Sequence, residues 1–173
     1  MILGNKDITE YVDSGRLVIS PLSEDTIREN GVDLRIGDEM MRFVHSEEEV
    51  DVNDKDALER LYRREKINGP FIINPNERVL VKMKEHIKMP NDLVGFSNIR
   101  STFARLGVII PPTIADAGFE GDLTILIVGG SVPIKVTPGT RFLHLIFSKT
   151  KSEVTKPYSG KYQKSGGVTG AKV

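Results

Sequence analysis

Short apolar runs separated by turn residues recur along the second half of this chain and constrain its fold more than any other feature. From Phe71 onward each run spans only a few residues before proline, glycine or asparagine interrupts it. The interruptions are Asn74-Pro75-Asn76, Met89-Pro90-Asn91-Asp92, Pro111-Pro112, Gly129-Gly130-Ser131 and Thr137-Pro138-Gly139. Short strands between regularly spaced turns are typical of β-sandwiches and β-barrels. The sequence therefore predicts a mainly β fold.

The first half of the chain predicts the same class with a helix added. Apolar and polar residues alternate over 32–36 and, in part, over 79–83, which is typical of strands. A short helix is expected over 5–14 with Asn5 as its N-cap, followed by a brief strand over 17–21 that ends at proline.

Residues 46–68 are crowded with charge and lack strand alternation. A helical turn or two is expected around 57–65, with Leu58 and Leu61 on its apolar side. One interpretation is a charged insertion that binds a partner or regulates the protein. A solvated surface loop is the favoured interpretation, because charge runs are usually solvated.

Length and composition limit the function classes. A chain of 173 residues suffices for one domain with a real core, so we expect a single domain over 1–173. Lys plus Arg equals Asp plus Glu at 24 each, so no overall field attracts nucleic acid or an anionic membrane. The chain has no cysteine, and its three histidines lack metal-ligand spacing, which excludes a deaminase with a thiolate zinc site.

Membrane and export signals are not expected either. The longest apolar run, 123–128, is far too short to span a bilayer, and Lys6 and Asp7 place charge where a signal peptide would be apolar. We expect a soluble, cytoplasmic protein.

A cluster of cations and hydroxyls forms the first candidate binding site, on a short helix expected over 100–107 and capped by Ser101 or Asn98. Its members are Arg100, Ser101, Thr102 and Arg105. Backbone N–H groups at a helix start and nearby guanidiniums favour an anion such as a phosphate chain. Arg105 follows Ser101 by four residues and shares its helical face. A purely capping role for Ser101 and a surface ion pair for Arg105 stay open.

Asp116 is the candidate base. It lies between Ala115 and Ala117 in an apolar, proline-led stretch, where a carboxylate has little structural purpose. Hydrolysis of a nucleoside triphosphate requires a group of this kind to orient water. Formation of a turn before Gly118 is the alternative role for this carboxylate.

The C-terminal residues 157–173 suit a flexible lid. Glycines at 166, 167 and 170 give this end conformational freedom. A tail that a ligand orders can exclude water during a reaction. Composition alone favours an ordinary frayed terminus.

Five segments together resemble the superfamily of trimeric dUTPases and dCTP deaminases. They are 30–37 (NGVDLRIG), 100–107 (RSTFARLG), 116–121 (DAGFEG), 138–142 (PGTRF) and the tail residues Pro157, Tyr158, Lys161, Tyr162 and Gln163. The resemblance covers nearly the whole chain. It implies a distorted β-barrel or jelly-roll-like dUTPase-type fold with one or two short helices, and a homotrimer whose active sites form between subunits.

The resemblance also implies residue roles. Asp116 would hold the attacking water, with Ser101 and Arg105 as the other catalytic residues. The hairpin from Thr113 to Thr124, including Ala115, would read the pyrimidine, and Phe119 would pack under the deoxyribose. Triphosphate binding is implied for Arg100, Ser101, Thr102, Arg105, Tyr158, Lys161, Tyr162 and Gln163. Mg²⁺ would arrive on the triphosphate oxygens of dUTP or dCTP, without metal ligands from the chain.

One departure from the superfamily pattern separates the functional alternatives. Its deaminases carry a glutamate on the strand after the hairpin, where this chain has Leu126. Leucine can neither deprotonate water nor protonate leaving ammonia. With Asp116 retained, the sequence favours a dUTP diphosphatase over a catalytically silent nucleotide sensor. A dCTP deaminase, mono- or bifunctional, stays open because the length and the opening residues 1–8 resemble that branch.

Overall fold

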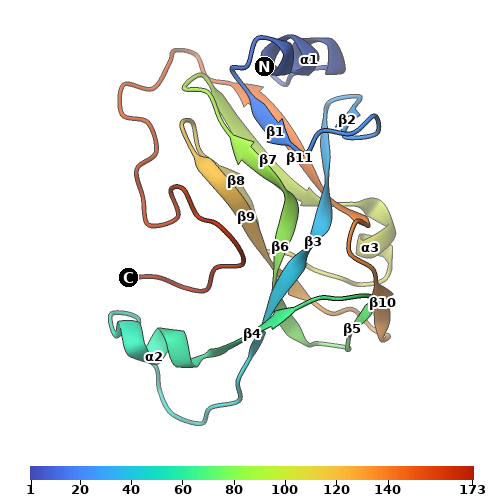
Figure 1. The fold of residues 1–173 in the computed structure, drawn as a ribbon, viewed down its shortest axis with the longest axis vertical. Helices are drawn as coiled ribbons and strands as arrows, with labels where there is room; N and C mark the ends of the chain where they lie inside the picture. Colours follow the sequence, from blue (N-terminus) through green and yellow to red (C-terminus); the bar gives the residue numbers. More distant parts are fainter.

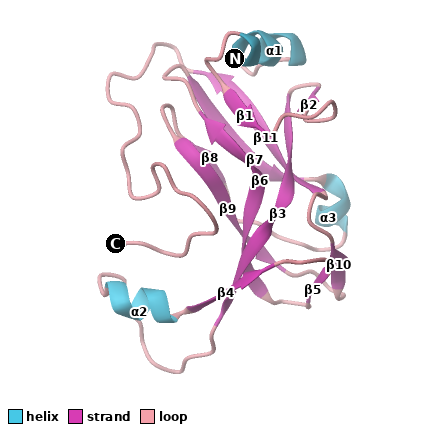
Figure 2. Cartoon of the chain, viewed as in Figure 1, coloured by secondary structure: helices cyan, strands magenta, loops and turns pink.

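Strands dominate the computed structural model, which describes residues 1–173 (Figures 1 and 2). The elements follow in the order α1 (Asn5–Asp13), β1 (Val18–Ser20), β2 (Ile27–Arg28), β3 (Gly31–Phe43), α2 (Lys55–Arg60), β4 (Tyr62–Lys66), β5 (Phe71–Ile73), β6 (Arg78–Lys88), β7 (Leu93–Ile99), α3 (Ser101–Arg105), β8 (Thr113–Ala115), β9 (Glu120–Val128), β10 (Ile134–Val136) and β11 (Arg141–Lys149). The predicted mainly β class is confirmed. None of the three helices is long and apolar enough to cross a membrane.

The long strand β3 joins the two halves of one curled sheet. Its first residues pair with β2 and β11, as in Val32 opposite Leu145, and its later residues pair with β6 and β4, as in Met41 opposite Leu80. Strand β7 extends one half to β8, and β6 extends the other half to β9. All of these pairs are antiparallel, and the sheet curls so that β8 and β9 form its two ends (Figure 1). The space between these ends holds the site described below.

The hydrophobic core fills the inside of this curled sheet. Its largest fully buried side chains include Phe142 and Phe147 on β11 and Ile125 and Ile127 on β9. Burying one such side chain stabilises the fold by roughly 1.5–3 kcal/mol. Along β9, buried and half-buried residues alternate strictly. This alternation leaves Asp122, Thr124 and Leu126 together on the other face of the strand.

Strand β3 differs from its predicted half-buried character. The strand itself is confirmed over 32–36, but its polar residues Asp33 and Arg35 are buried as well. Ion pairs explain this burial: Nη1 of Arg35 donates to Oε1 of the buried Glu85 at 2.6 Å. A buried charge is tolerated when it is paired and hydrogen-bonded. Sequence alternation alone could not reveal that partner, which lies 50 residues away on β6.

The charged segment 46–68 contains one helix and one strand. Helix α2 begins after Asp54, whose carboxylate accepts from the Ala57 N–H, and ends at Arg60. The predicted helix over 57–65 is therefore wrong in its second half, where β4 pairs with the end of β3. Packing of the Tyr62 ring on Phe43, with 5.1 Å between centroids, favours the strand over the helix.

Both predicted helix caps are shifted by one residue. The N-cap of α1 is Gly4 rather than Asn5, and the N–H of Gly4 donates to Asp7 at 3.0 Å. The N-cap of α3 is Arg100, without a side-chain cap, so Ser101 is the first helical residue and Asn98 still belongs to β7. The prediction that Ser101 or Asn98 caps this helix is therefore wrong. The hydroxyl of Ser101 is thus left free for another partner.

Candidate active site

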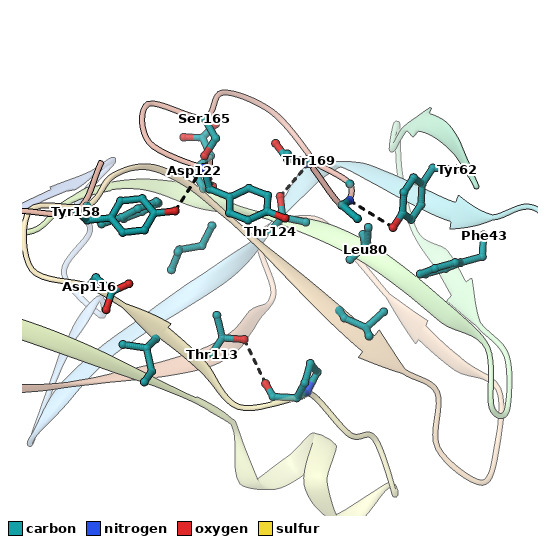
Figure 3. A pocket seen from close by; sticks show the side chains of 18 residues that line it. Phe43, Tyr62, Leu80, Thr113, Asp116, Asp122, Thr124, Tyr158, Ser165 and Thr169 are labelled. Atoms are coloured by element: carbon teal, nitrogen blue, oxygen red, sulfur yellow. Dashed lines mark hydrogen bonds between the residues drawn. The ribbon is translucent and has the colours of Figure 1, made fainter. Parts of the chain in front are cut away.

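A cavity of about 500 Å³ lies between the two ends of the curled sheet (Figure 3). Strands β8 and β9 form its walls, and the C-terminal tail closes one side. Its volume falls in the range that small-molecule sites occupy. The lining residues are Phe43, Tyr62, Leu80, Pro111, Thr113, Ile114, Asp116, Phe119, Asp122, Leu123, Thr124, Leu126, Tyr158, Tyr162, Ser165, Thr169, Gly170 and Ala171.

Asp116 lies at the turn that joins β8 to β9. Its carbonyl accepts from the Phe119 N–H at 3.0 Å, and Gly118 adopts a φ of +82°, which favours glycine. The flanking Ala115 and Ala117 are buried, whereas the Asp116 side chain is exposed toward the cavity and makes no ion pair or hydrogen bond within the chain. Its carboxylate is thus available to a water or a ligand.

The two strands of the segment 113–124, which the resemblance implied to be a hairpin, do not pair with each other. Strand β8 pairs with β7, and β9 pairs with β6, so the two strands belong to opposite ends of the sheet. The curl of the sheet brings them together at the turn. As a result Thr113 and Phe119 do line one cavity, while Ala115 is buried beside Gly95.

The wall formed by β9 and β6 is apolar at one end. Leu126 lines the cavity there, and its Cα partner on β6 is Leu80. Phe43 and Tyr62 continue this apolar end. No carboxylate faces the cavity at the Leu126 position, so this end of the cavity offers no side-chain acid.

Asp122 lies on the same face of β9 as Leu126, but its carboxylate already has hydrogen-bond partners within the chain. Its Oδ1 lies 3.0 Å from Nδ1 of His86, and its Oδ2 accepts the N–H of Gly167 at 3.0 Å. The ammonium of Lys82 lies 3.9 Å from the same Oδ2. Both oxygens therefore have structural partners.

The tail contributes two predicted tyrosines to the cavity. The ring of Tyr158 contacts Phe119 edge to face, with 5.8 Å between centroids, and Tyr162 lines the same wall. Gln163 does not line the cavity but ties the tail to the turn: it donates to the Gly118 carbonyl at 2.9 Å and accepts from the Glu120 N–H at 3.0 Å. Lys161 is exposed, outside the lining, and donates to the Lys172 carbonyl.

Backbone donors of the last residues bond to side chains of the sheet. The N–H of Val168 donates to Glu39 at 3.1 Å, and the N–H of Thr169 donates to Thr124 at 3.0 Å. Val168 itself is fully buried. The sequence offered no signal for these contacts, because Thr124 and Glu39 are far from the tail along the chain.

The predicted phosphate-binding cluster at the start of α3 lies elsewhere on the molecule. Arg100 and Ser101 line a second cavity of about 320 Å³, together with Arg28, Glu29, Asp33, Asn98, Ile99 and His144. Thr102 and Arg105 are exposed on α3 and line neither cavity. One chain therefore brings together Asp116, Thr113, Phe119, Tyr158 and Tyr162, but not the cation cluster.

Buried Asp33 organises this second cavity. Its Oδ2 pairs with Arg100 and lies 3.6 Å from Nη1 of Arg141, while its Oδ1 lies 2.9 Å from Nδ1 of His144. Burial lowers the pKa of His144, and the charge of Arg100 lowers it further. Burial also lowers the pKa of Arg100, with added repulsion from Arg141 and Arg28. Mutual repulsion of these cations favours an anion in the cavity.

Comparison with known proteins places the chain in a family. Residues 2–150 match the dCTP deaminase-like family. The chain belongs to this family. It is 56% identical over 172 residues, 99% of each chain, to a protein named as a probable deoxyuridine 5′-triphosphate nucleotidohydrolase of Sulfolobus islandicus rod-shaped virus 1. It is also 54% identical over 169 residues to a dCTP deaminase of Acidianus ambivalens, covering 98% of this chain and 96% of that one.

Solved structures of this kind have the same fold. A dCTP deaminase from Agrobacterium tumefaciens superposes with a TM-score of 0.69 at 22% identity, over 84% of this chain and 46% of that one. A mutant dUTPase of Staphylococcus bacteriophage 80alpha superposes with a TM-score of 0.50 at 15% identity, over 83% and 97%. These likenesses confirm the predicted dUTPase-type fold. The dCTP deaminase-like family consists of enzymes of nucleotide metabolism, as the sequence resemblance implied.

Several cavity residues were not predicted from the sequence. Phe43, Tyr62 and Leu80 come from strands that the motifs do not touch, and Leu80 carried only the signal of an alternating strand. Asp33 fell within the matched segment 30–37 but had no assigned role. His144 was considered only as a metal ligand, and nothing in the sequence paired it with Asp33, which is 111 residues away.

Proposed function

We propose that this dCTP deaminase-like protein is a dUTP diphosphatase that hydrolyses dUTP to dUMP and pyrophosphate. The observation that carries the proposal is Leu126, paired with Leu80 in the wall of the same cavity that an unpaired Asp116 lines. The cavity then offers a carboxylate for water but no acid at the position where the family's deaminases carry glutamate. Hydrolysis at phosphorus needs the first of these and not the second.

In this reaction Asp116 orients a water molecule and draws its proton as the oxygen attacks the α phosphorus. The bond from that phosphorus to the bridging oxygen of the β phosphate breaks, and pyrophosphate leaves with the electron pair. Cations near the phosphates stabilise the charge that develops on the leaving group. Phe119 under the deoxyribose and Thr113 beside the pyrimidine position the nucleoside, whereas the predicted Ala115 is buried outside the cavity lining.

The remaining predicted residues act on the triphosphate. Since Arg100, Ser101, Thr102 and Arg105 lie outside the cavity that holds Asp116, we infer that a second copy of the chain supplies them in a homotrimer. Ser101 and Arg105 then act as catalytic partners of Asp116. Tyr158, Lys161, Tyr162 and Gln163 belong to a tail that closes over the substrate. Mg²⁺ enters on the triphosphate oxygens and neutralises part of their charge.

Deamination of dCTP is the second candidate function. The name of the Acidianus relative, at 54% identity, favours it. Its chemistry needs a carboxyl group near the cytosine amino group, and the acid that lines the cavity on the same face of β9 as Leu126 is Asp122. One Asp122 oxygen pairs with His86 on β6 and the other accepts from Gly167 in the tail, so deamination requires that these partners first release the carboxylate.

One product assay separates the two functions. Purified protein is incubated with Mg²⁺ and either dUTP or dCTP, and dUMP, dUTP, pyrophosphate and ammonia are quantified. We expect pyrophosphate and dUMP from dUTP, and no ammonia from dCTP. Asp116→Asn should lower dUTP turnover at least about 100-fold, because its amide cannot accept the proton. Asp13→Asn, at an exposed aspartate at the end of α1, is the matched control. Ammonia released from dCTP would overturn the diphosphatase assignment.

A further inference from the structure

His144 and Asp33 form a side-chain pair in the wall of the smaller cavity. Strands β11 and β3 place the two residues directly opposite each other, and Nδ1 of His144 lies 2.9 Å from Oδ1 of Asp33. Asp33 is 1% exposed and also pairs with Arg100, so the position of its carboxylate is fixed. The pair therefore holds the imidazole in one orientation beside Arg100 and Ser101.

The second nitrogen of this ring has no partner. With Nδ1–H donating to Asp33, the neutral ring carries a lone pair on Nε2, and Nε2 makes no hydrogen bond within the chain. The edge that bears Nε2 lies against Gly31, where a Cβ atom would come within 2.8 Å of that nitrogen. Glycine at this position therefore lets the ring keep its place in the cavity wall.

We propose that the His144–Asp33 pair takes up a proton when phosphate oxygens enter the smaller cavity, so that Nε2–H donates a hydrogen bond to the bound anion. The identity of the anion, a deoxynucleoside triphosphate, rests on the proposed function. The proposal deepens that function because it makes substrate binding depend on a proton at a named atom. His144 is thereby a substrate-binding residue of the phosphate end of the site.

Charged groups from every neighbouring element face this imidazole. Arg100 at the start of α3 and Arg28 on β2 repel its protonated form, whereas Glu29, which follows β2, attracts it. Asp33 on β3 accepts its Nδ1–H, and Arg141 on β11 in turn contacts Asp33. Burial and the two arginines together lower the pKa of His144. The imidazole is therefore neutral near pH 7 when no anion is bound.

A bound triphosphate reverses this balance. Its negative charges compensate Arg100 and Arg28, and an opposite charge within hydrogen-bonding range raises the pKa of a titrating group by about 1–3 units. Between the lower pKa of the free protein and the higher pKa of the complex, affinity falls about tenfold for each unit of rising pH. A proton is taken up from the solution on binding in the same range.

Calorimetry measures this proton directly. The binding of the non-hydrolysable analogue α,β-imido-dUTP is followed at pH 7 in two buffers that differ in ionisation enthalpy. We expect the wild type to take up a substantial fraction of one proton. His144→Gln keeps an N–H donor but cannot titrate, so it should bind with no such uptake. His45→Gln removes an exposed loop histidine, serves as the matched control and should behave as the wild type. Equal uptake by His144→Gln and wild type would overturn the proposal.

Nuclear magnetic resonance of the three histidine rings tests the same step without relying on a variant's fold. The Cε1–H resonance of His144 should titrate at higher pH when imido-dUTP is bound, whereas that of His45 should not move. An unchanged His144 titration contradicts proton uptake. The two proposals can fail separately. If dUTP is hydrolysed but no proton is taken up on binding, only the His144 proposal is overturned. If binding takes up a proton but dUTP is not hydrolysed, only the diphosphatase function is overturned.

Discussion

Leu126 is the residue at which the chemistry of the cavity can be altered most directly. Because the wall around it is apolar, we expect Leu126→Glu to carry a raised carboxyl pKa and to lower the free energy of unfolding by roughly 1–3 kcal/mol at pH 8. A raised folded-state pKa means that the folded protein binds more protons, so the loss should shrink at pH 5. Urea unfolding at both pH values measures it. Leu126→Gln is the uncharged control, and an equal loss at the two pH values would contradict an apolar environment.

His144 should make stability depend on pH in the absence of ligand. Its pKa in the folded protein lies below the ordinary value because of burial and Arg100, so the unfolded chain binds more protons at mildly acidic pH. The free energy of unfolding should therefore be level above about pH 7 and should fall as pH drops below about 6.5. Denaturant unfolding of the wild type and His144→Gln between pH 5 and 8, at one protein concentration, checks this. The free energy of unfolding of the variant should fall less steeply over this pH range. The same slope in both proteins would mean that another titrating group causes it.

Single residues differ in how far the sequence could predict them. Asp116 was predicted as the base because a carboxylate between two alanines has little structural purpose, and the structure leaves this side chain unpaired. Asp33 and Arg35 were recognised only as parts of a strand, since their ion-pair partners are distant in sequence. The helix caps were shifted because a side chain that can cap also occurs as the first helical residue, as Ser101 does.

At the scale of elements, helix α1 is held to the start of β7 by one carboxylate. The Tyr11 hydroxyl donates to Oδ2 of Asp92 at 2.6 Å, and Arg16, just beyond the helix, donates to the same oxygen at 2.8 Å. Burial works to raise the pKa of Asp92, but these hydrogen bonds outweigh it and the net pKa is lowered. The carboxylate therefore stabilises the fold above about pH 4, and this contribution is lost as pH falls through its lowered pKa.

Replacement of this carboxylate should loosen the helix. We expect Asp92→Asn to lower the free energy of unfolding by about 1–3 kcal/mol at pH 7, because a buried charge-assisted hydrogen-bond acceptor is lost. The difference between variant and wild type should narrow below about pH 4, where the wild-type carboxyl also becomes protonated. Thermal or urea unfolding at pH 7 and pH 3 checks both statements. Glu153→Gln, on an exposed loop, is the control, and a constant difference at both pH values would exclude the charge as its cause.

The C-terminal tail is the second element whose attachment can be tested. Val168 is fully buried, and the backbone N–H groups of Gly167, Val168 and Thr169 donate to side chains of the sheet. We expect Val168→Ala to weaken this attachment by roughly 1–2 kcal/mol and to speed proteolytic cleavage of the tail about tenfold. Val173→Ala changes an exposed residue, and the protease should cleave this variant at the wild-type rate. Equal cleavage of the two variants would show that the Val168 side chain does not hold the tail.

Strand content was predictable from apolar periodicity, whereas strand partners were not. The run 62–66 carries charges that indicated a helix or a loop, yet pairing with β3 and the Tyr62–Phe43 contact make it a strand. In the same way, the turn at Gly118 was correctly expected, but β8 and β9 that flank it pair with different neighbours. Periodicity reports the faces of a strand and carries no information on its register or partner.

At the scale of the whole molecule, the curl of the sheet separates the predicted active-site residues into two cavities. One chain offers the Asp116 carboxylate and the tail in the larger cavity, and Arg100 and Ser101 in the smaller one. Neither cavity alone combines the proposed base with the proposed phosphate-binding cations. In an oligomer, the smaller cavity of one copy can adjoin the larger cavity of the next, so that each site contains both groups of residues. A closed ring of identical contacts gives every copy such a site.

Mixed oligomers test this arrangement. Asp116→Asn and Arg105→Ala chains should each hydrolyse dUTP at least about 100-fold more slowly than the wild type, because each lacks one half of every site. When the two variants are unfolded together and refolded as an equal mixture, a site is complete only where an intact Asp116 adjoins an intact Arg105. Random assembly gives about one quarter of the sites this composition, so about one quarter of wild-type activity should return. Separate refolding followed by mixing is the control, and no recovery after joint refolding would mean that Asp116 and Arg105 of one chain serve the same site.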